Sequence, residues 1–370
     1  MAGAGRHLIL IGGGHTHLFV LEAFARRGLP GAQVTLVSPS PRSTYSGMVP
    51  GVIARQYPLR AAQIDVARLA ARAGGSFHAA RAVGIDPVAR AIHLDDGRRL
   101  TYDLASFDIG ARTPLPAHTG AYQSVIPIKP IEPAMADIDA ALAAHPSCRA
   151  VVIGAGAGGA EVAFALAARL RRAPASAVAL CDRAAKPVES LGPRAAHLVE
   201  RALAEADVHW IGGVEVEGID SRGVRLRGGR TVAADLVISA AGAGPIDIFA
   251  SAGLPVDERG CALVGDDLRS IAHPEIFAAG DCATLTRYPD LPKAGVHAVR
   301  QGPILAHNLR AAPIGGRMRR YRPQRRMLAL LNTADGRAIL AYGALAAHNR
   351  AAWWLKDRID RGFVRRFDRP

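Results

Sequence analysis

Two stretches of the chain share one order of apolar, glycine-rich and amphipathic segments. In the first, an apolar strand at 7–11 is followed by a glycine turn at 12–14, a helix at about 17–27 and a strand at 33–38. In the second, the same order gives a strand at 150–153, a turn at 154–159, a helix at 160–172 and a strand at 177–182. Each stretch predicts a βαβ unit, and two such units predict an α/β fold with two Rossmann-like, doubly wound domains.

A second similarity links the two halves. In each half a β-hairpin follows the βαβ unit, with its turn at 96–97 or at 228–229. A closing strand then ends in a glycine, Gly110 in one half and Gly242 in the other, with a proline soon after. We expect the chain to cross between domains at these points, the Pro-rich stretch 113–133 being a linker. We expect a discontinuous first domain formed by residues 1–112 and 245–320. The second domain, residues 113–244, is inserted within it, and residues 321–370 form a C-terminal basic amphipathic segment.

Composition agrees with a soluble protein of two domains. The chain has 370 residues, 49% hydrophobic and 21% charged, which excludes global disorder. The first residues lack the layout of a signal peptide, and no run of about 18 apolar residues occurs. We therefore expect a cytoplasmic protein, with peripheral contact at the inner face of the membrane left open. Four cysteines lie apart without metal or redox spacing, so neither a metal site nor a vicinal disulfide is expected.

Positive charge is concentrated near the C-terminus. The net charge is +14, and residues 310–370 hold 15 Lys and Arg against four Asp. Four apolar side chains share one helical face there, namely Leu355, Ile359, Phe363 and Phe367. With Trp353 and Trp354 and the surrounding basic residues, this is typical of an interfacial helix that brings residues 345–370 onto anionic lipid. A helix docked on the body of the protein or on a partner subunit, as in a homodimer, fits the same pattern. Nucleic acid is not expected, because no nucleic-acid module accompanies the charge.

The second glycine turn has the spacing of a dinucleotide-binding loop. It follows an apolar strand and opens a helix, with glycines at Gly154, Gly156, Gly158 and Gly159. Such glycines allow a tight turn, close approach to a pyrophosphate and close packing of helix on strand. Asp182 ends the next strand, where an acid binds the ribose hydroxyls of NADH, although Arg183 beside it leaves NADPH open. Glu161 and Gly242 are further candidates at this NAD(P)H site.

The first glycine turn is less regular. His17 stands where a third glycine is usual, and Ser38 stands where the ribose acid is usual, although its hydroxyl can still donate to a ribose. The candidates for this second nucleotide are residues of the turn and of nearby segments: Gly12, Gly14, His15, Thr16, His17, Ser38, Arg42 and Gly110. We interpret the two histidines as phosphate or packing contacts rather than as metal ligands.

A Gly-Asp pair late in the chain indicates which nucleotide the first turn holds. An apolar strand leads to Gly280 and Asp281, and the Asp281 carboxylate can accept hydrogen bonds from the ribityl hydroxyls of a flavin. A helix expected to begin near Ala294 would place its positive N-terminal dipole beside the flavin edge where negative charge develops. Lys293 would add to this effect, unless it is a solvated loop lysine. FAD is therefore expected in the first domain, contacted here by Lys293, Ala294, Gly295 and Val296.

The segment 45–51 follows the second strand of the first unit, where a loop can approach a flavin. Tyr45 and Pro50 are candidate contacts of the reaction site, together with Lys293. The alternative is an ordinary turn held by two glycines and a proline.

Together these motifs resemble the two-dinucleotide flavoproteins of the pyridine nucleotide-disulfide oxidoreductase superfamily, in the branch of type II NADH dehydrogenases and sulfide:quinone oxidoreductases. Four segments resemble more closely the flavoprotein module fused ahead of selenide, water dikinase: 12–17, 38–39, 45–51 and 353–360. The resemblance covers nearly the whole chain. No kinase portion is present in the sequence, which therefore resembles a stand-alone version of this module. It implies FAD on the first domain, NAD(P)H on the second, and hydride transfer through the flavin N5.

Two departures limit what the resemblance implies. Sulfide oxidation needs a pair of cysteines flanking the flavin, and none is convincingly placed, since Cys282 follows Asp281 and is expected to be structural. The glutamines of the dehydrogenase quinone motif are replaced by Val296 and Arg300. We therefore predict an FAD-dependent NAD(P)H:acceptor oxidoreductase that passes electrons to a quinone or another small molecule. The alternatives are oxidation of a sulfur or selenium compound, and a flavin-binding redox sensor or accessory subunit.

Overall fold

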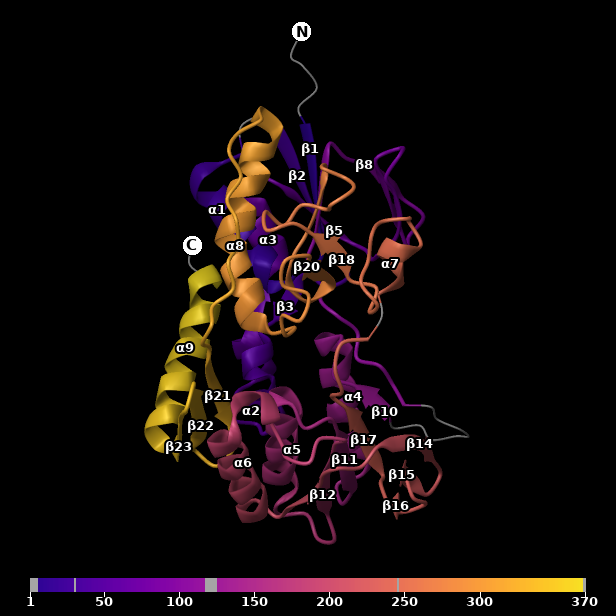
Figure 1. The fold of residues 1–370 in the computed structure, drawn as a ribbon, viewed down its shortest axis with the longest axis vertical. Coiled ribbons are helices and arrows are strands. Elements are labelled where there is room, and N and C mark those ends of the chain that lie inside the picture. Colours follow the sequence, from indigo (N-terminus) through magenta and orange to yellow (C-terminus); the bar gives the residue numbers. More distant parts are fainter. Residues whose placement is uncertain (1–5, 30, 117–124, 245, 369–370) are drawn as a thin grey trace.

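The computed structural model describes residues 6–29, 31–116, 125–244 and 246–368. Two α/β lobes lie one above the other in Figure 1, and a C-terminal module runs along one side. Each lobe is built on a five-stranded sheet in which all neighbouring strands are parallel. A parallel sheet is covered on both faces, which explains why its central strands are nearly continuous apolar runs.

The first lobe carries the first glycine turn. Its sheet has the order β19-β9-β1-β2-β5. The strands are β1 (Arg6–Ile11), β2 (Ala32–Ser38), β5 (Ser76–Ala79), β9 (Leu104–Phe107) and β19 (Ile276–Ala278). The helices are α1 (His15–Arg27), α3 (Val66–Arg72), α7 (Asp247–Ala250) and α8 (Gly295–Ala311). Because β19 comes from after the second lobe, distant parts of the sequence complete this sheet.

The second lobe repeats the plan around the second glycine turn. Its sheet has the order β10-β17-β11-β12-β13. The strands are β10 (Val125–Pro127), β11 (Arg149–Ile153), β12 (Ala177–Cys181), β13 (Val208–Ile211) and β17 (Leu236–Ser239). The helices are α4 (Ile131–Ala144), α5 (Ala157–Leu170) and α6 (Pro193–Glu205).

Each half also contains the antiparallel hairpin that the sequence predicts. The strands are β6 (Ala82–Asp86), β7 (Ala91–Leu94) and β8 (Arg99–Thr101) in one half, and β14 (Val216–Asp220), β15 (Gly223–Leu226) and β16 (Thr231–Val232) in the other. The turns use glycines at positive φ, 83° at Gly97 and 93° at Gly228. Both first strands carry a register shift at a corresponding place, so the internal similarity is confirmed.

The C-terminal module is an antiparallel sheet followed by one long helix. It contains β21 (Leu328–Asn332), β22 (Ala338–Tyr342), β23 (Leu345–Asn349) and α9 (Arg350–Asp368). Smaller elements complete the fold, namely β3 (Arg42–Thr44), β4 (Gln63–Asp65), β18 (Ala262–Val264), β20 (Ala283–Leu285) and α2 (Val49–Ile53). In Figure 1 the module lies beside both lobes.

The α/β class, the two Rossmann-like sheets and the helical C-terminal segment are as expected from the sequence. The domain boundaries stay a prediction, and the linker part 117–124 and the boundary residue 245 lie outside the described residues. Within the described part of the chain, no helix is both long and apolar enough to cross a bilayer.

Candidate functional site

The first glycine turn requires glycine at two positions. Gly12 has a φ of 93°, a conformation that favours glycine. A Cβ atom on Gly12 would collide with the Asp108 backbone, and one on Gly14 would collide with the Asp108 side chain. Helix α1 begins directly afterwards, and its N-cap residue Gly14 has no side chain to cap it. The turn thus offers a helix N-terminus and a backbone surface clear of side chains, which fits a dinucleotide pyrophosphate.

His17, in place of the third glycine, is fully buried. Its Nδ1 lies 2.7 Å from the carbonyl oxygen of Gly12, and its Nε2 lies 2.9 Å from the hydroxyl oxygen of Ser106. Burial lowers the pKa of this ring to about 4, so it is neutral at pH 7. Both ring nitrogens therefore hold the turn to β9. Of the two roles weighed from the sequence, packing is the one that this geometry favours.

Asp108, at the end of β9, is a buried acid that the sequence analysis did not single out. Its carboxylate accepts a hydrogen bond from the backbone N–H of His17 at 3.0 Å, in the first turn of α1. Burial raises its pKa to about 7. The sequence offered one signal for Asp108: it is an acid directly after an apolar strand and two residues before Gly110. Its place beside a candidate phosphate site makes its charge important.

The Gly280–Asp281 pair lies next to this turn. A Cβ atom on Gly280 would come too close to the Asp108 carboxylate and would be 3.7 Å from the Thr16 hydroxyl. The Asp281 carboxylate forms an ion pair with Lys129 at 2.7 Å. Lys129 comes from the second lobe, between β10 and α4. The sequence did not indicate it as a site residue, because it lies in the Pro-rich stretch that was interpreted as a linker. The contact joins the second lobe to the Gly280–Asp281 pair of the first lobe.

Lys293 is not a solvated loop lysine. Its Nζ donates to the carbonyl oxygen of Ala283 at 2.5 Å and to the hydroxyl of Thr284 at 2.7 Å. Helix α8 begins two residues later, at Gly295, and its N-cap residue Ala294 provides no side-chain cap. The expected helix N-terminus is therefore present, with an ammonium group held close to it.

A small cavity lies at this helix start, lined by Gly280, Asp281, Lys293 and His297 among others. The Nδ1 of His297 is 2.8 Å from the hydroxyl oxygen of Tyr321. Its Nε2 is buried, and no hydrogen-bond partner for it lies among the described residues. An uncapped helix N-terminus, a lysine and an unpaired polar atom around a cavity fit the polar edge of a flavin.

The second glycine turn has the geometry of a dinucleotide loop. Gly154 has a φ of 103°, and a Cβ atom on Gly159 would collide with the Gly154 carbonyl, so the helix packs closely on the strand end. A Cβ atom on Gly156 or on Gly158 would meet open space. The Asp182 carboxylate accepts from the backbone N–H of Ala155 at 2.5 Å. The expected acid therefore lies beside the turn, whose outer side is open.

The remaining nucleotide candidates keep their expected roles as predictions. Ser38 is buried, with its hydroxyl oxygen beside Gly13. Arg42 and Arg183 are exposed, and Gly110 and Gly242 have positive φ values with open space at their Cβ positions. Thr16 donates its hydroxyl to the carbonyl oxygen of Ala298 at 3.0 Å, so it joins α1 to α8.

A buried lysine on α9 lies between two carboxylates. The Nζ of Lys356 is 3.1 Å from Asp360 Oδ2 and 3.6 Å from Glu161 Oε1, and it donates to the carbonyl oxygen of Gly47 at 2.9 Å. Tyr45 forms a side-chain hydrogen bond with Asp360. We call Tyr45, Glu161, Lys356 and Asp360 the buried ionic cluster. It joins the segment after β3, helix α5 of the second lobe and helix α9.

The electrostatics of the cluster follow from burial and proximity. Burial lowers the pKa of Lys356, but the neighbouring Glu161 and Asp360 carboxylates raise it more, so the net shift is upward. Burial raises the pKa of Glu161 and of Asp360, and Lys356 offsets part of this effect. Glu161 was expected at the NAD(P)H site, yet its carboxylate accepts from the backbone N–H of Asn332 at 2.7 Å and faces Lys356. Its position links the second lobe to the C-terminal module.

Tyr45 connects the cluster to the first glycine turn. Its ring stacks on Phe363 at 4.3 Å between centroids, and the His15 ring lies 5.4 Å away. Burial, followed by the nearby Asp360 charge, raises the pKa of Tyr45 well above its usual value. Pro50 instead lies buried in the first turn of α2, because proline suits that position of a helix. The segment 45–51 is therefore largely helical. Of the two candidate reaction-site contacts in it, Tyr45 is the one that lies beside the first glycine turn.

Helix α9 docks on the rest of the protein with part of the face that was expected to contact lipid. Phe363 and Phe367 pack inward on Phe19, at centroid distances of 6.1 and 5.2 Å. Trp354 and Ile359 remain outside, 60% and 43% exposed. The expected continuous lipid-facing stripe is thus wrong, because aromatic packing uses its C-terminal half. The alternative of a docked helix describes α9 better.

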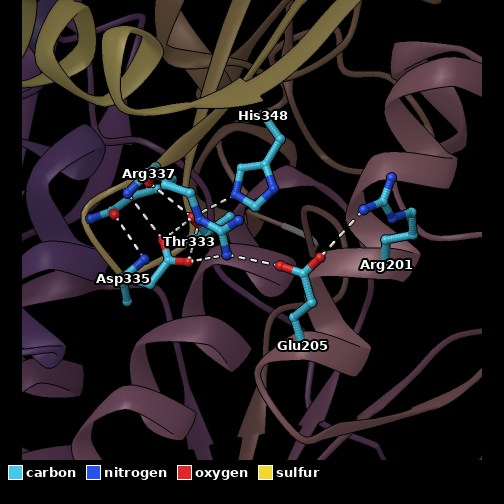
Figure 2. Close-up of polar contacts among 8 residues, drawn as sticks. Arg201, Glu205, Thr333, Asp335, Arg337 and His348 are labelled. Atoms are coloured by element: carbon cyan, nitrogen blue, oxygen red, sulfur yellow. Dashed lines mark hydrogen bonds and ion pairs between the residues drawn. The ribbon is translucent and has the colours of Figure 1, made fainter.

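The sheet of the C-terminal module docks on the second lobe through charges. Figure 2 shows Arg337 between Asp335 and Glu205, with Arg337 nitrogens 2.5 and 2.8 Å from the two carboxylates. Thr333 and His348 complete the network on the module side. The module therefore contacts α6 with its sheet and the first lobe with α9.

The four cysteines provide no reactive pair. All four are free and buried. Burial raises the pKa of each thiol, to about 12 for Cys181, so the thiolate form that acts as a nucleophile is disfavoured. Chemistry that needs a cysteine pair at a flavin finds no support here.

Comparison with known proteins identifies the family. Residues 6–302 match the family described as pyridine nucleotide-disulphide oxidoreductase, and the chain belongs to this family. FAD and NAD(P)H are its cofactors. An NADH dehydrogenase-like protein of Mycobacterium tuberculosis is 28% identical over 294 residues, which cover 75% of this chain and 72% of the relative. Another NADH dehydrogenase-like protein, from Bacillus subtilis, is 22% identical, covering 79% of this chain and 81% of the relative.

Solved structures show the same fold over nearly the whole chain. The sulfide:quinone oxidoreductase of Aquifex aeolicus superposes with a TM-score of 0.81 at 20% identity, covering 98% of this chain and 91% of that one. NDH2 of Plasmodium falciparum, solved with NADH, gives a TM-score of 0.81 at 12% identity, covering 97% of each chain.

Proposed function

We propose that this member of the pyridine nucleotide-disulphide oxidoreductase family is an FAD-dependent NAD(P)H:acceptor oxidoreductase whose acceptor is a quinone. In the balanced reaction, NAD(P)H and one proton reduce the quinone to a quinol and leave NAD(P)⁺. When bound, FAD accepts two electrons from the reduced nicotinamide and delivers them to the acceptor. The protein binds both nucleotides, orients them, excludes water and holds the protons.

The first lobe would hold FAD. Gly12 and Gly14 leave a backbone surface for its pyrophosphate, and Asp281 would accept hydrogen bonds from its ribityl hydroxyls. The N-terminus of α8 and Lys293 would favour negative charge on the flavin edge. Ser38, Arg42 and Gly110 are the candidates for the adenosine half.

The second lobe would hold NAD(P)H. Gly156 and Gly158 are open on the outer side of the turn, and Asp182 lies beside it as the candidate ribose acid. Arg183 is exposed next to Asp182 and could donate hydrogen bonds to the 2′-phosphate of NADPH, so NADPH stays in the proposal.

One observation carries the proposal for the acceptor: the buried ionic cluster lies where both lobes and α9 meet, and its member Tyr45 contacts His15 directly after the first glycine turn. Quinone reduction consumes two protons, so groups that hold protons are needed close to the acceptor. In the cluster, two carboxyls share one ammonium, which leaves capacity for one further proton. Burial raises the pKa of Glu161 and of Asp360, which favours the form that holds this proton.

The two alternatives have less support. Oxidation of a sulfur compound through cysteines disagrees with four buried thiols of raised pKa. The resemblance to the module fused to selenide, water dikinase rests on four short motifs and keeps selenium compounds among the substrates to be screened. A redox sensor without turnover would not need a proton-holding cluster at the meeting point of two nucleotide lobes.

A membrane surface is the proposed location of the acceptor. Leu345, Trp354 and Ile359 are exposed on the C-terminal module, and we call them its outer side; Arg358 lies over the Trp354 ring. Apolar side chains among arginines suit the interface of an anionic bilayer. We therefore propose peripheral attachment at the inner face of the membrane through this outer side rather than through the stripe that includes Phe363 and Phe367.

The test compares acceptors in anaerobic steady-state assays of the FAD-loaded protein with NADH and NADPH. A soluble quinone, a one-electron dye and selenium or sulfur compounds are offered separately. We expect quinone reduction to exceed the others and to fall at least tenfold in Asp360→Asn, the change expected when one proton-holding group is lost. Asp290→Asn, on an exposed loop, is the control. Equal use of all acceptors, or no effect of Asp360→Asn, would show that the quinone assignment is wrong.

A further inference from the structure

A basic groove lies at the end of the first lobe that faces away from the glycine turn. It has a volume of about 2060 Å³ and lies between α8, the start of β1 and the segment 315–322 that follows α8. Seven arginines and His307 line it, including Arg317, Arg319, Arg320 and Arg322. This concentration of charge is not explained by the oxidoreductase site.

The groove is separate from the nucleotide site. Arg6 begins β1 and lines the groove, whereas the glycine turn follows the other end of this six-residue strand. Six residues of β-strand span about 20 Å. A ligand in the groove therefore does not touch the candidate flavin site, and the groove is not a second entrance to it.

Each acid of the groove has one oxygen engaged, although no partner for the buried Asp266 Oδ1 lies among the described residues. Asp266 forms an ion pair with Arg287 at 3.4 Å, and Asp267 accepts from the backbone N–H of Arg269 at 3.2 Å. By contrast, no acceptor for the guanidinium groups of Arg317, Arg319, Arg320 and Arg322 occurs among the residues that the structure describes. These side chains are exposed and available to an external anion.

The backbone of this segment is fixed, although its charges repel one another. Asn308 accepts from the N–H of Arg319 at 2.8 Å and donates to its carbonyl oxygen at 2.9 Å. Tyr321 is buried, and its N–H donates to the carbonyl oxygen of Asp266 at 2.7 Å. Holding four like charges along one short segment costs stability, and such departures from good packing are expected at functional sites.

We propose that this groove binds a linear polymer of phosphates, such as inorganic polyphosphate. Guanidinium groups bind phosphate oxygens with paired hydrogen bonds, and a row of them suits phosphates repeated along a chain. Among the described residues, no Phe, Tyr or Trp lines the groove, so it lacks the stacking platforms that single-stranded nucleic acid uses. Its hollow shape suits a flexible chain better than the flat surface of a bilayer.

The test measures binding of long-chain inorganic polyphosphate to the FAD-loaded protein over a range of salt concentrations. The variant Arg317→Ser/Arg319→Ser/Arg320→Ser removes three unpaired charges. The control Arg222→Ser/Arg225→Ser/Arg227→Ser removes three arginines that already face acids on β14–β16. We expect the slope of log K against log salt to fall by about 2 to 3 in the groove variant and to stay unchanged in the control.

Further probes separate the possible anions. Orthophosphate, a single-stranded oligonucleotide and phosphatidylglycerol vesicles are titrated in the same way. Weak binding of all three supports the proposal. Equal slopes in the wild type, the groove variant and the control would overturn it, because charge alone would then explain binding. Tighter binding of the oligonucleotide or of vesicles, lost in the groove variant, would also overturn it and assign the groove to that ligand.

Discussion

Lys356 is a buried cation on which two carboxylates depend. Its Nζ lies 3.1 Å from Asp360 and 3.6 Å from Glu161. Removing the cation would leave both acids buried without a partner. We expect Lys356→Met to lower the free energy of unfolding by about 3 to 5 kcal/mol at pH 7, measured by urea denaturation. The exposed Arg358→Met, two residues away, should change it little; equal losses in both variants would show that the cluster is not buried as described.

The pKa of Asp108 gives a pH dependence of known sign. Burial raises this pKa from 3.8 to about 7 in the folded protein. Between these two values the folded state binds more protons at Asp108 than the unfolded state, so the contribution of Asp108 to stability is greatest below about pH 4 and falls until about pH 7. We expect urea midpoints of the FAD-free protein to decline over this range, and Asp108→Asn to weaken the decline. The same decline in the variant would contradict the assignment, with the exposed Asp290→Asn as the control.

Gly156 allows the nucleotide site of the second lobe to be blocked without disturbing the fold. Its φ is −64°, which any residue adopts, and a Cβ atom there would meet open space. We expect Gly156→Val to retain FAD and thermal stability but to weaken NAD(P)H binding at least tenfold, because the side chain would occupy the place of the pyrophosphate. Gly362→Val, also in open space but on α9, is the control. Unchanged nucleotide binding would place the NAD(P)H site elsewhere.

Among the elements, α9 has two faces with different roles. Phe367 is buried against Phe19, while Trp354 is 60% exposed. We expect Phe367→Ala to lower the free energy of unfolding by about 3 to 5 kcal/mol, and Trp354→Ala to lower it by under about 0.5 kcal/mol. Flotation with anionic vesicles should give the opposite ranking: Trp354→Ala should reduce the fraction of folded protein bound to vesicles more than Phe367→Ala does. Similar stability losses in the two variants would contradict the docked orientation of α9.

The sequence predicts those elements whose signal is local. Apolar strands followed by glycine turns identify β1, β11 and the helices after them, and the turns at Gly97 and Gly228 identify the hairpins. The burial of half of α9 could not be predicted in this way. An amphipathic helix has the same pattern whether it meets lipid or protein, and the outcome depends on Phe19 and Tyr45, more than 300 residues earlier.

The same limit applies to the site. The glycines were predictable, because turn geometry and phosphate approach exclude side chains at their positions. Lys129, Asp108 and Lys356 were not, because each acquires its importance only from a partner far away in the sequence. Glu161 shows the same effect, since its place in a glycine motif suggested the nucleotide while its carboxylate faces α9.

At the scale of the whole molecule, three contacts tie the lobes into one unit. Lys129 of the second lobe pairs with Asp281 of the first, Glu161 meets Lys356 of α9, and Arg337 meets Glu205 of α6. The first two contacts include a residue of the candidate flavin site or of the buried ionic cluster, and the third joins the C-terminal module to the second lobe. On the proposed function, these contacts would hold the two candidate nucleotide lobes and the buried ionic cluster in fixed relation, as transfer from NAD(P)H to an acceptor through FAD requires.

Anaerobic stopped-flow mixing of the FAD-loaded protein with NADH or NADPH tests this account most directly. The flavin absorbance should bleach rapidly with at least one of the two nucleotides in the wild type and in Gly362→Val, and only slowly in Gly156→Val. A second mixing with a soluble quinone should restore the absorbance. Failure of both nucleotides to bleach the flavin of the wild-type protein would contradict the proposed oxidoreductase function.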